Sequence, residues 1–155
     1  MTDPAGTVKL SVLGEIRTPF DQNHCPRFAD ESLSEECRII LLPEFQPGLR
    51  DLEKFNYIYV LFFLDRPHRE TSLTAHPPRG QGLEVGVFAS CSPTRPNRIG
   101  LSIVRLKRIE NDTLITSALD AYDHTPLLDL KPYFKDGDCK TEANNGWISD
   151  RPLPG

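Results

Sequence analysis

The chain has 155 residues, 38% of them hydrophobic and 26% charged, which is the balance of a folded soluble protein large enough to bury its own core. Its formal net charge of −4 argues against a protein that coats nucleic acid without specificity. No apolar run approaches the roughly 20 residues of a membrane-spanning helix, and the first residues lack the pattern of a signal peptide. We expect one cytoplasmic domain over 1–155, with a core at about 7–135, an irregular tail at 136–155 and no membrane segment.

The first part of the chain predicts one strand, one ambiguous segment and a helical turn. Apolar and polar residues alternate over 7–13, the period of a half-buried strand, and Gly14 then permits a bend or bulge. Segment 37–42 has no clear period, so it fits either a short helix after a capping box at Ser32 or a strand. Residues 49–55 predict one or two helical turns after a Pro-Gly turn.

The rest of the chain predicts a mostly β fold. Residues 57–64 are apolar on both faces and predict a central strand, whereas 65–82 is a long polar loop of a kind that is usually functional or mobile. Three further strands are predicted, at 83–90, 99–109 and 114–119, the last two joined by a hairpin turn. We expect a compact single-domain β-barrel or strongly curled sheet of about six or seven strands, with one or two short helices. The alternating strands and helices of a Rossmann domain are missing.

Cysteine and histidine residues are too scattered to predict a metal site. The four cysteines form no C-x-x-C pair and the four histidines lack ligand spacing; they are Cys25, Cys37, Cys91, Cys139, His24, His68, His76 and His124. We expect reduced thiols and no bound metal. The charge of Arg95 would favour a thiolate at Cys91, although simple packing of this side chain is the favoured interpretation.

Residues 88–108, FASCSPTRPNRIGLSIVRLKR, form a basic segment. It contains no acid and five basic residues, so the remainder of the chain carries −9; the five are Arg95, Arg98, Arg105, Lys107 and Arg108. Its Arg-Pro-Asn turn holds an arginine and main-chain donors at little entropic cost, because proline fixes the backbone. A basic site on an acidic body suits a specific anionic ligand, and the alternative is a solvated basic strand edge.

A second polar segment, DAYDHTPLLDLKPYF at 120–134, gathers side chains at a strand-to-loop transition: Asp120, Tyr122, Asp123, His124 and Thr125. If this acidic turn meets the basic turn in the fold, the two suit a zwitterionic ligand. Alternatively, their Arg and Asp side chains pair with one another as a scaffold. No nucleophile elbow, P-loop or G-x-G-x-x-G segment is present, which excludes these catalytic and nucleotide-binding classes.

These two segments carry a resemblance to a known family. FASCSPTRPNRIGLS followed by LDAYDHTPLLDLKPYF resembles the signatures F-A-T-R-S-P-x-R-P-N-x-I-G-L-S and D-G-T-P-x-L-D-I-K-P-Y of the TsaA/TrmO-like family of tRNA methyltransferases. Shorter matches, IRTPF, CPRF, PGLRDLEKFNYIYVLFFL and GVFA, occur in the same order. The resemblance therefore covers nearly the whole chain up to about residue 134.

The resemblance implies a fold, a cofactor and a reaction. Members of the family are compact β-barrels that bind S-adenosylmethionine without a Rossmann sheet, usually as homodimers with the cofactor near the interface. They methylate the N6 nitrogen of threonylcarbamoyl-adenosine beside the anticodon of certain tRNAs. Transfer from a sulfonium to a nitrogen depends mostly on alignment, because the methyl group is already activated.

The resemblance also implies site residues. Carried over by position, the cofactor-binding residues are Pro26, Arg27, Phe28, Asp65, Arg66, Cys91, Leu101, Tyr122, Asp123, His124, Thr125 and Pro126. Candidate bases for the acceptor nitrogen are His124, then Asp123 and Tyr122. Arg95 is expected as a pocket wall, and the residues expected to meet the RNA substrate are Asn97, Arg98, Arg105, Lys107 and Arg108.

Three positions depart from the family pattern. Phe28 replaces a glutamine, Cys91 an arginine and His124 a glycine. Losing the arginine would remove about 1.5–3 kcal/mol if that residue held a charged ligand. Two alternatives therefore stay open: a non-enzymatic module that binds S-adenosylmethionine or a related adenosine compound, and a methyltransferase that acts on a small molecule.

Overall fold

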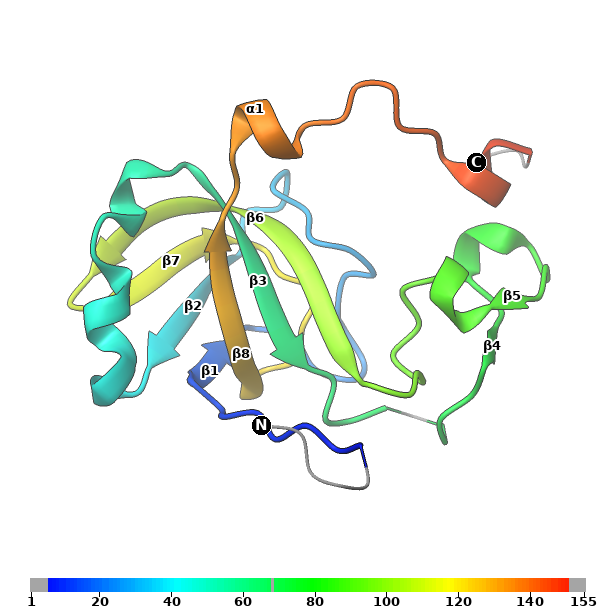
Figure 1. The fold of residues 1–155 in the computed structure, drawn as a ribbon, viewed down its shortest axis with the longest axis horizontal. Coiled ribbons are helices and arrows are strands. Elements are labelled where there is room, and N and C mark those ends of the chain that lie inside the picture. Colours follow the sequence, from blue (N-terminus) through cyan, green and yellow to red (C-terminus); the bar gives the residue numbers. More distant parts are fainter. Residues whose placement is uncertain (1–5, 68, 151–155) are drawn as a thin grey trace. The chain divides into compact units, whose positions relative to one another are not determined.

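The computed structural model describes residues 6–67 and 69–150, and six of its strands close into a barrel in the order β1-β2-β7-β6-β3-β8 (Figure 1). The barrel strands are β1 (Gly14–Arg17), β2 (Glu36–Leu41), β3 (Tyr57–Phe63), β6 (Ile99–Glu110), β7 (Thr113–Ser117) and β8 (Thr125–Pro132). The predicted fold class, a mostly β barrel without Rossmann alternation, is confirmed.

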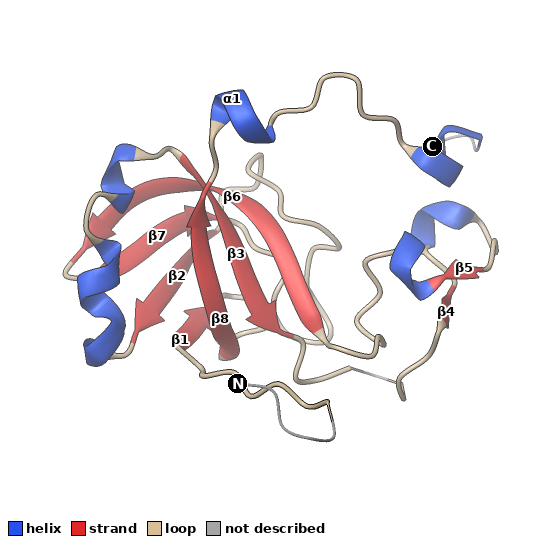
Figure 2. Cartoon of the chain, viewed as in Figure 1, coloured by secondary structure: helices blue, strands red, loops and turns tan. Residues whose placement is uncertain are grey.

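The remaining elements are short (Figure 2). They are the strands β4 (Thr74–Ala75) and β5 (Val85–Gly86), the helix α1 (Lys135–Asp138), and the 3₁₀ helices η1 (Pro43–Leu49), η2 (Leu52–Lys54), η3 (Pro78–Gly80), η4 (Val87–Ala89) and η5 (Gly146–Asp150). The predicted helical turns at 49–55 are thus 3₁₀ turns. Within the described part of the chain, every helix is too short or too polar to cross a membrane.

The chain divides into two compact units. The barrel unit comprises the residues up to 63 together with 101–133, and the second unit comprises 64–100 together with the segment from 134 onward. The second unit contains a two-stranded sheet, in which Thr74 pairs with Gly86 and Ala75 with Val85. The expectation that 1–155 acts as one domain stays a prediction.

Side chains fill the barrel interior. On β2, Cys37, Ile39 and Leu41 point inward and are buried, while the residues between them are exposed. This alternation places 36–41 in a strand, so the strand alternative for this segment is the correct one. Fully buried side chains from the other barrel strands complete the core: Ile16, Ile58, Val60, Leu114 and Leu127.

The strand predicted at 7–13 is wrong. Val8, Leu10 and Val12 are 57%, 58% and 48% exposed, and the strand β1 starts at Gly14 instead. Alternation does not bury a segment that lacks strand partners on both sides, and here pairing starts only where the chain can lie against β2. A Cβ on Gly14 would stand 2.0 Å from the carbonyl oxygen of Ile40, so glycine is required for this close approach rather than for a bend.

The prediction of a strand over 83–90 is also wrong, except for two residues at its centre. Only Val85 and Gly86 form a strand, and the chain then turns into η4. The guanidinium of Arg95 donates to the carbonyl oxygens of Val87 at 3.4 Å and Ser90 at 2.8 Å, which stabilises the turn over a longer strand.

The β6–β7 hairpin agrees with the sequence prediction and adds a bulge. Asn111 and Asp112 have φ values of 48° and 63°, as a type I′ turn requires. The register of β6 against β7 shifts between Leu106 and Arg108. Lys107 is therefore an extra residue in the strand, and Lys107 and Arg108 are both exposed.

Candidate functional site

The acidic turn at 120–126 is fixed tightly in the barrel unit. The backbone amide of Asp123 donates to the carbonyl oxygen of Phe20 at 3.0 Å, and that of His124 donates to Ile16 at 2.9 Å. The Thr125 hydroxyl donates to the carbonyl oxygen of Tyr122 at 2.7 Å. The turn thus lies against β1 and the loop after it, with little freedom to move.

His124 adopts a left-handed backbone conformation, with φ at 68°. Such a conformation favours glycine, which is the residue of the resembled D-G-T-P signature at this position. The histidine ring lies beside two carboxylates, with its Nδ1 3.1 Å from Oε2 of Glu15 and its Nε2 3.4 Å from Oδ2 of Asp123. The substitution therefore adds a titratable side chain to an already charged cluster.

The carboxylate of Asp123 is already engaged. It accepts hydrogen bonds from Nε of Arg17 at 2.8 Å and from the backbone amide of Thr18 at 3.0 Å. The hydrogen bond from Arg17 is the main cause that lowers the pKa of this carboxyl below its usual value. Asp123 is thereby a weakened base, and it holds the turn against β1.

A cavity of about 620 Å³ lies beside His124 on the outside of β1 and β2. It is mostly apolar, with His124, Glu15 and Gln46 as its polar side chains and Gly14, Val12, Ile40, Leu41, Leu42, Pro43 and Pro126 as the rest. Of the predicted site residues, His124 and Pro126 line it.

Asp120 joins the acidic turn to the start of β6. Oγ of Ser102, next to Leu101, donates to Oδ1 of Asp120 at 2.5 Å. Burial raises the pKa of the Cys25 thiol to about 11, and the nearby charge of Asp120 adds to this rise. The hydrogen bond from Ser102 therefore joins the start of β6 to the acidic turn, and Cys25, the residue before Pro26, lies near enough to be affected by the charge of Asp120.

Six predicted site residues lie in the second unit instead. Asp65 and Arg66 form an ion pair of 3.2 Å, and Cys91 is exposed. Arg95, expected as a pocket wall, donates to backbone carbonyl oxygens within its own turn. Of the other two, Asn97 is exposed and Arg98 donates to the Thr71 hydroxyl at 3.4 Å.

The basic side chains of β6 are paired with acids. Nζ of Lys107 lies 3.1 Å from a carboxylate oxygen of Glu36, and Nη1 of Arg108 lies 3.4 Å from the same oxygen. Arg105 lies 3.7 Å from Glu31 and stacks over the ring of Tyr57 at 4.9 Å. The acids that pair with these three cations, Glu31 and Glu36, lie outside the acidic turn, so these contacts are not the predicted pairing of the two turns.

Arg38 is a cation that the sequence analysis missed. It lies opposite Arg17 on β1 and opposite Ile115 on β7, and Ile115 in turn lies opposite Arg108 on β6. We call Arg17, Arg38 and Arg108 the arginine row. Among residues 6–67 and 69–150, no acid forms an ion pair with Arg38. Only the strand register shows this row, because its members are far apart in the sequence.

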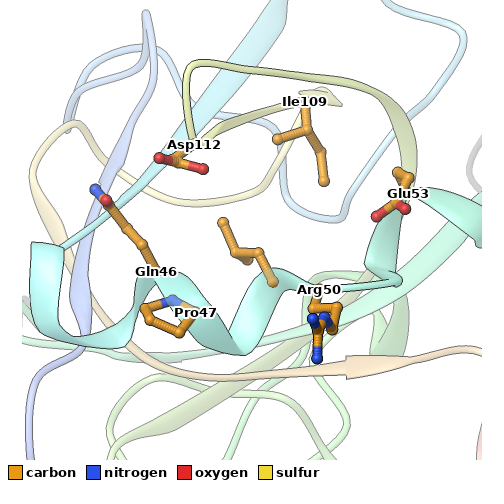
Figure 3. A pocket seen from close by; sticks show the side chains of 7 residues that line it. Gln46, Pro47, Arg50, Glu53, Ile109 and Asp112 are labelled. Atoms are coloured by element: carbon orange, nitrogen blue, oxygen red, sulfur yellow. The ribbon is translucent and has the colours of Figure 1, made fainter.

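A second cavity, of about 710 Å³, lies near the β6–β7 turn (Figure 3). Its walls come from η1, η2 and the hairpin, and they are Gln46, Pro47, Leu49, Arg50, Glu53, Ile109 and Asp112. None of the predicted site residues lines it. The described ranges hold no cluster of three or more potential metal ligands, and His68 lies outside these ranges.

Comparison with known proteins places these features in a family. The family described as tRNA-methyltransferase O N-terminal domain matches residues 15–139. A protein of Archaeoglobus fulgidus named S-adenosyl-L-methionine-binding protein is 38% identical over 134 residues, covering 84% of this chain and 92% of that protein. A Mus musculus protein named tRNA (adenine(37)-N6)-methyltransferase is 34% identical over 139 residues, covering 89% of this chain and 32% of that protein.

A solved structure has the same fold. The crystal structure of TrmO from Pseudomonas aeruginosa superposes with a TM-score of 0.73 at 32% identity, covering 90% of this chain and 62% of that one. The chain thus spans about a third of the mouse protein's length and less than two thirds of the crystallised chain.

Proposed function

The chain belongs to the tRNA-methyltransferase O N-terminal domain family, and from this premise we propose that it is an S-adenosylmethionine-dependent methyltransferase that methylates N6 of threonylcarbamoyl-adenosine in tRNA. The observation that carries this proposal is the hydrogen bond that joins the start of β6 to the 120–126 turn at Asp120, with Cys25, next to the 26–28 loop, near enough to be affected by the charge of Asp120. The relatives' names, which include both cofactor binding and tRNA methylation, support it.

The residues in the barrel unit fit such a cofactor. The side chain of Phe28 is 65% exposed and offers an aromatic face to an adenine ring. The hydrogen-bonded turn at 122–126 offers a rigid wall, and Asp120 offers a negative charge. We assign Pro26, Arg27, Phe28, Leu101 and 122–126 to the cofactor, all of them in the barrel unit. The bound cofactor would supply an activated methyl group, so the chain's own task is alignment.

His124 is the proposed base for the acceptor nitrogen. Its ring is 59% exposed, and Glu15 and Asp123 hold its two nitrogens within 3.1 and 3.4 Å. An exposed imidazole in this position can reach a substrate and exchange a proton with it. Asp123 then acts as a positioning residue, because Arg17 and Thr18 already occupy its carboxylate.

The arginine row is the proposed contact for the tRNA backbone. Arg17 and Arg38 lie on neighbouring strands, about 5 Å apart, and Arg108 lies two strands from Arg38, about 10 Å away, so the row presents several charges to one polyanion. Arg38 is exposed and lacks an ion pair among the described residues, whereas Arg105, Lys107 and Arg108 would have to exchange acids for phosphates. We expect Arg38→Ala to weaken tRNA binding about threefold to tenfold in a filter-binding assay. The affinity of the variant should also depend less on salt concentration than that of the wild type, because one phosphate contact is lost. An unchanged affinity would remove the row from the site.

We also propose that the chain forms homodimers and acts in the cytoplasm. The outer face of β6 exposes Leu101 and Ile103, at 60% and 46%, and adjacent large exposed apolar side chains favour an interface. Sedimentation equilibrium of the purified protein should give about twice the chain mass of 17.5 kDa. A weak dimer has a dissociation constant on the order of 100 µM. If the measured mass stays at that of one chain up to this protein concentration, the dimer is contradicted.

The test of the function is titration calorimetry followed by a transfer assay. We expect micromolar binding of S-adenosylmethionine, and then transfer of its methyl group to tRNA that carries threonylcarbamoyl-adenosine but not to the same tRNA with plain adenosine. Transfer to both tRNAs would reject the proposed acceptor, and absent cofactor binding would reject the enzyme.

A second candidate function is a module that binds S-adenosylmethionine and transfers nothing. One observation favours it: the relative matched over 92% of its own length is named a binding protein, whereas the named mouse methyltransferase is about three times as long as the matched part. A single-turnover assay with labelled cofactor separates the two candidates. Cofactor that binds but remains unconsumed with modified tRNA would identify the module.

A further inference from the structure

We propose that Asp120 supplies the negative charge that holds the positively charged part of S-adenosylmethionine in the barrel unit, an inference that rests on the proposed function. Asp120 lies in the acidic turn, and the sequence alone gives it no role. Three observations support the assignment: its burial, the chemistry of its neighbours and its place in the turn assigned to the cofactor.

Asp120 is a largely buried carboxyl group without a cation. Burial is the main cause that raises its pKa above the usual value, and the hydrogen bond from Ser102 opposes that rise. No Lys, Arg or His of the described ranges forms an ion pair with it. An unpaired buried carboxylate is costly, so such a group is retained where something compensates its charge.

The neighbours of Asp120 are neutral. They are the Ser102 hydroxyl, which donates to Oδ1, and the thiols of Cys25 and Cys37, whose pKa values burial raises. Cys37 is fully buried, and its sulfur accepts a hydrogen bond from the amide of Leu119 at 3.3 Å. This side of the group therefore offers one hydroxyl and no positive charge.

The carboxyl group retains capacity for a further partner. An ionised carboxylate can accept about four hydrogen bonds, and Asp120 receives one from Ser102 and one from its own backbone amide. The residue is only part-buried, so one side stays accessible. Asp120 belongs to the same turn as Tyr122, Asp123 and His124, which are assigned to the cofactor.

A ligand with a positive charge fits this carboxylate. S-adenosylmethionine has two such centres, the sulfonium and the α-ammonium group, and both share the chemistry that Asp120 would recognise. S-adenosylhomocysteine keeps only the ammonium, and 5′-methylthioadenosine has neither. The three compounds therefore test which charge is held, because they share the adenosine part.

The experiment titrates the three compounds into the wild-type protein and Asp120→Asn. We expect the variant to lose about tenfold to hundredfold in affinity for S-adenosylmethionine, since a charge-assisted contact is removed, and to keep its affinity for methylthioadenosine. An equal loss for S-adenosylhomocysteine assigns Asp120 to the ammonium, and no loss assigns it to the sulfonium. Glu53→Gln, in the wall of the other cavity, removes the same charge and should change nothing.

Two outcomes would overturn the inference. Either Asp120→Asn binds all three compounds like the wild type, or it loses all three equally, which indicates a damaged pocket. If the wild type itself binds none, the proposed function fails, which is a different result. Should Asp120→Asn not fold, Asp120→Ser is titrated in its place.

Stability of the ligand-free protein gives an independent readout. Because the pKa of Asp120 is raised in the folded state, its stabilising contribution is complete below the unfolded-state pKa and is lost as the pH rises through the folded-state pKa. Asp120→Asn should therefore melt above the wild type at pH 7, and the two should converge in acid. A variant that melts lower at every pH would show that Asp120 is structural, which overturns the inference.

Discussion

The barrel unit and the second unit are stabilised in different ways. Buried hydrophobic side chains lie almost entirely in the barrel, where they come from all six strands, while Ala75 and Val87 are the ones found within 64–100. The second unit depends on local hydrogen bonds instead, such as those from Arg95 to carbonyl oxygens and from Trp147 Nε1 to the carbonyl oxygen of Ala89 at 2.8 Å.

This difference predicts in which unit substitutions are tolerated. A barrel closes through pairing along its whole circumference, so a fault in one strand affects the complete core. Local hydrogen bonds couple less widely, so the second unit should open and vary without unfolding the barrel. Substitutions in the two units can therefore break or sharpen the comparison.

The largest effect is expected in the barrel core. Phe62 is 2% exposed on β3, and Phe62→Ala should lower the free energy of unfolding by about 3–5 kcal/mol through lost burial and the cavity left behind. Chemical denaturation measures this loss. A loss below about 1 kcal/mol would show that the barrel does not act as one cooperative core.

The next effect concerns the closure of the barrel at β1. Gly14→Ala would place a methyl group against the Ile40 carbonyl oxygen, and we expect a loss of about 1–3 kcal/mol or more. Gly48→Ala is the matched control, because nothing lies within 4 Å of a Cβ at that position, and it should stay within about 0.5 kcal/mol. Equal behaviour of the two variants would contradict the close approach of β1 and β2.

A local effect is expected in the second unit. Arg95→Ala removes hydrogen bonds to Val87, Ser90 and Ser92, and it should destabilise residues 87–92 by about 1–2 kcal/mol. Hydrogen exchange should become faster there and remain unchanged in β2 and β7. Faster exchange throughout the barrel would show that the two units are energetically one.

The smallest effect concerns the ion pair of the acidic turn. Since Arg17 lowers the pKa of Asp123, the pair stabilises the fold above the unfolded-state pKa, and this contribution is lost as the pH falls through the folded-state pKa. Asp123→Asn should lower the melting temperature slightly at neutral pH and match the wild type in strong acid. Thermal melts over pH 2–7 test this, and a difference that persists in acid would indicate a role other than charge.

Much of the fold was predictable because its signals are local. The β6–β7 hairpin combines alternation with an Asn-Asp turn, and β3 is apolar on both faces. The errors at 7–13 and 83–90 have one cause. Alternation was read as burial, although burial depends on whether strand partners are available, and this is a property of the whole barrel.

The candidate site was predictable only in part. The polar side chains of 120–125 are visible in the sequence, the family pattern assigns the turn to the cofactor, and the structure shows how β1 holds it. Asp120 and Arg38 could not be given roles, because Asp120 depends on Ser102 and Cys25, and Arg38 on the strand register. Neither relation exists within a short stretch of sequence.

The bulge at Lys107 has a consequence for the evolution of chain length. Before the bulge, the side chains of Ser102, Val104 and Leu106 face the interior. After it, the side chain of Ile109 does, so the inward-facing residues are even-numbered before the bulge and odd-numbered after it. Removing Lys107 would restore regular alternation without moving any inward side chain to the solvent. This strand can therefore gain or lose one residue while the barrel keeps the same core, so homologous chains that differ in length here should share one fold.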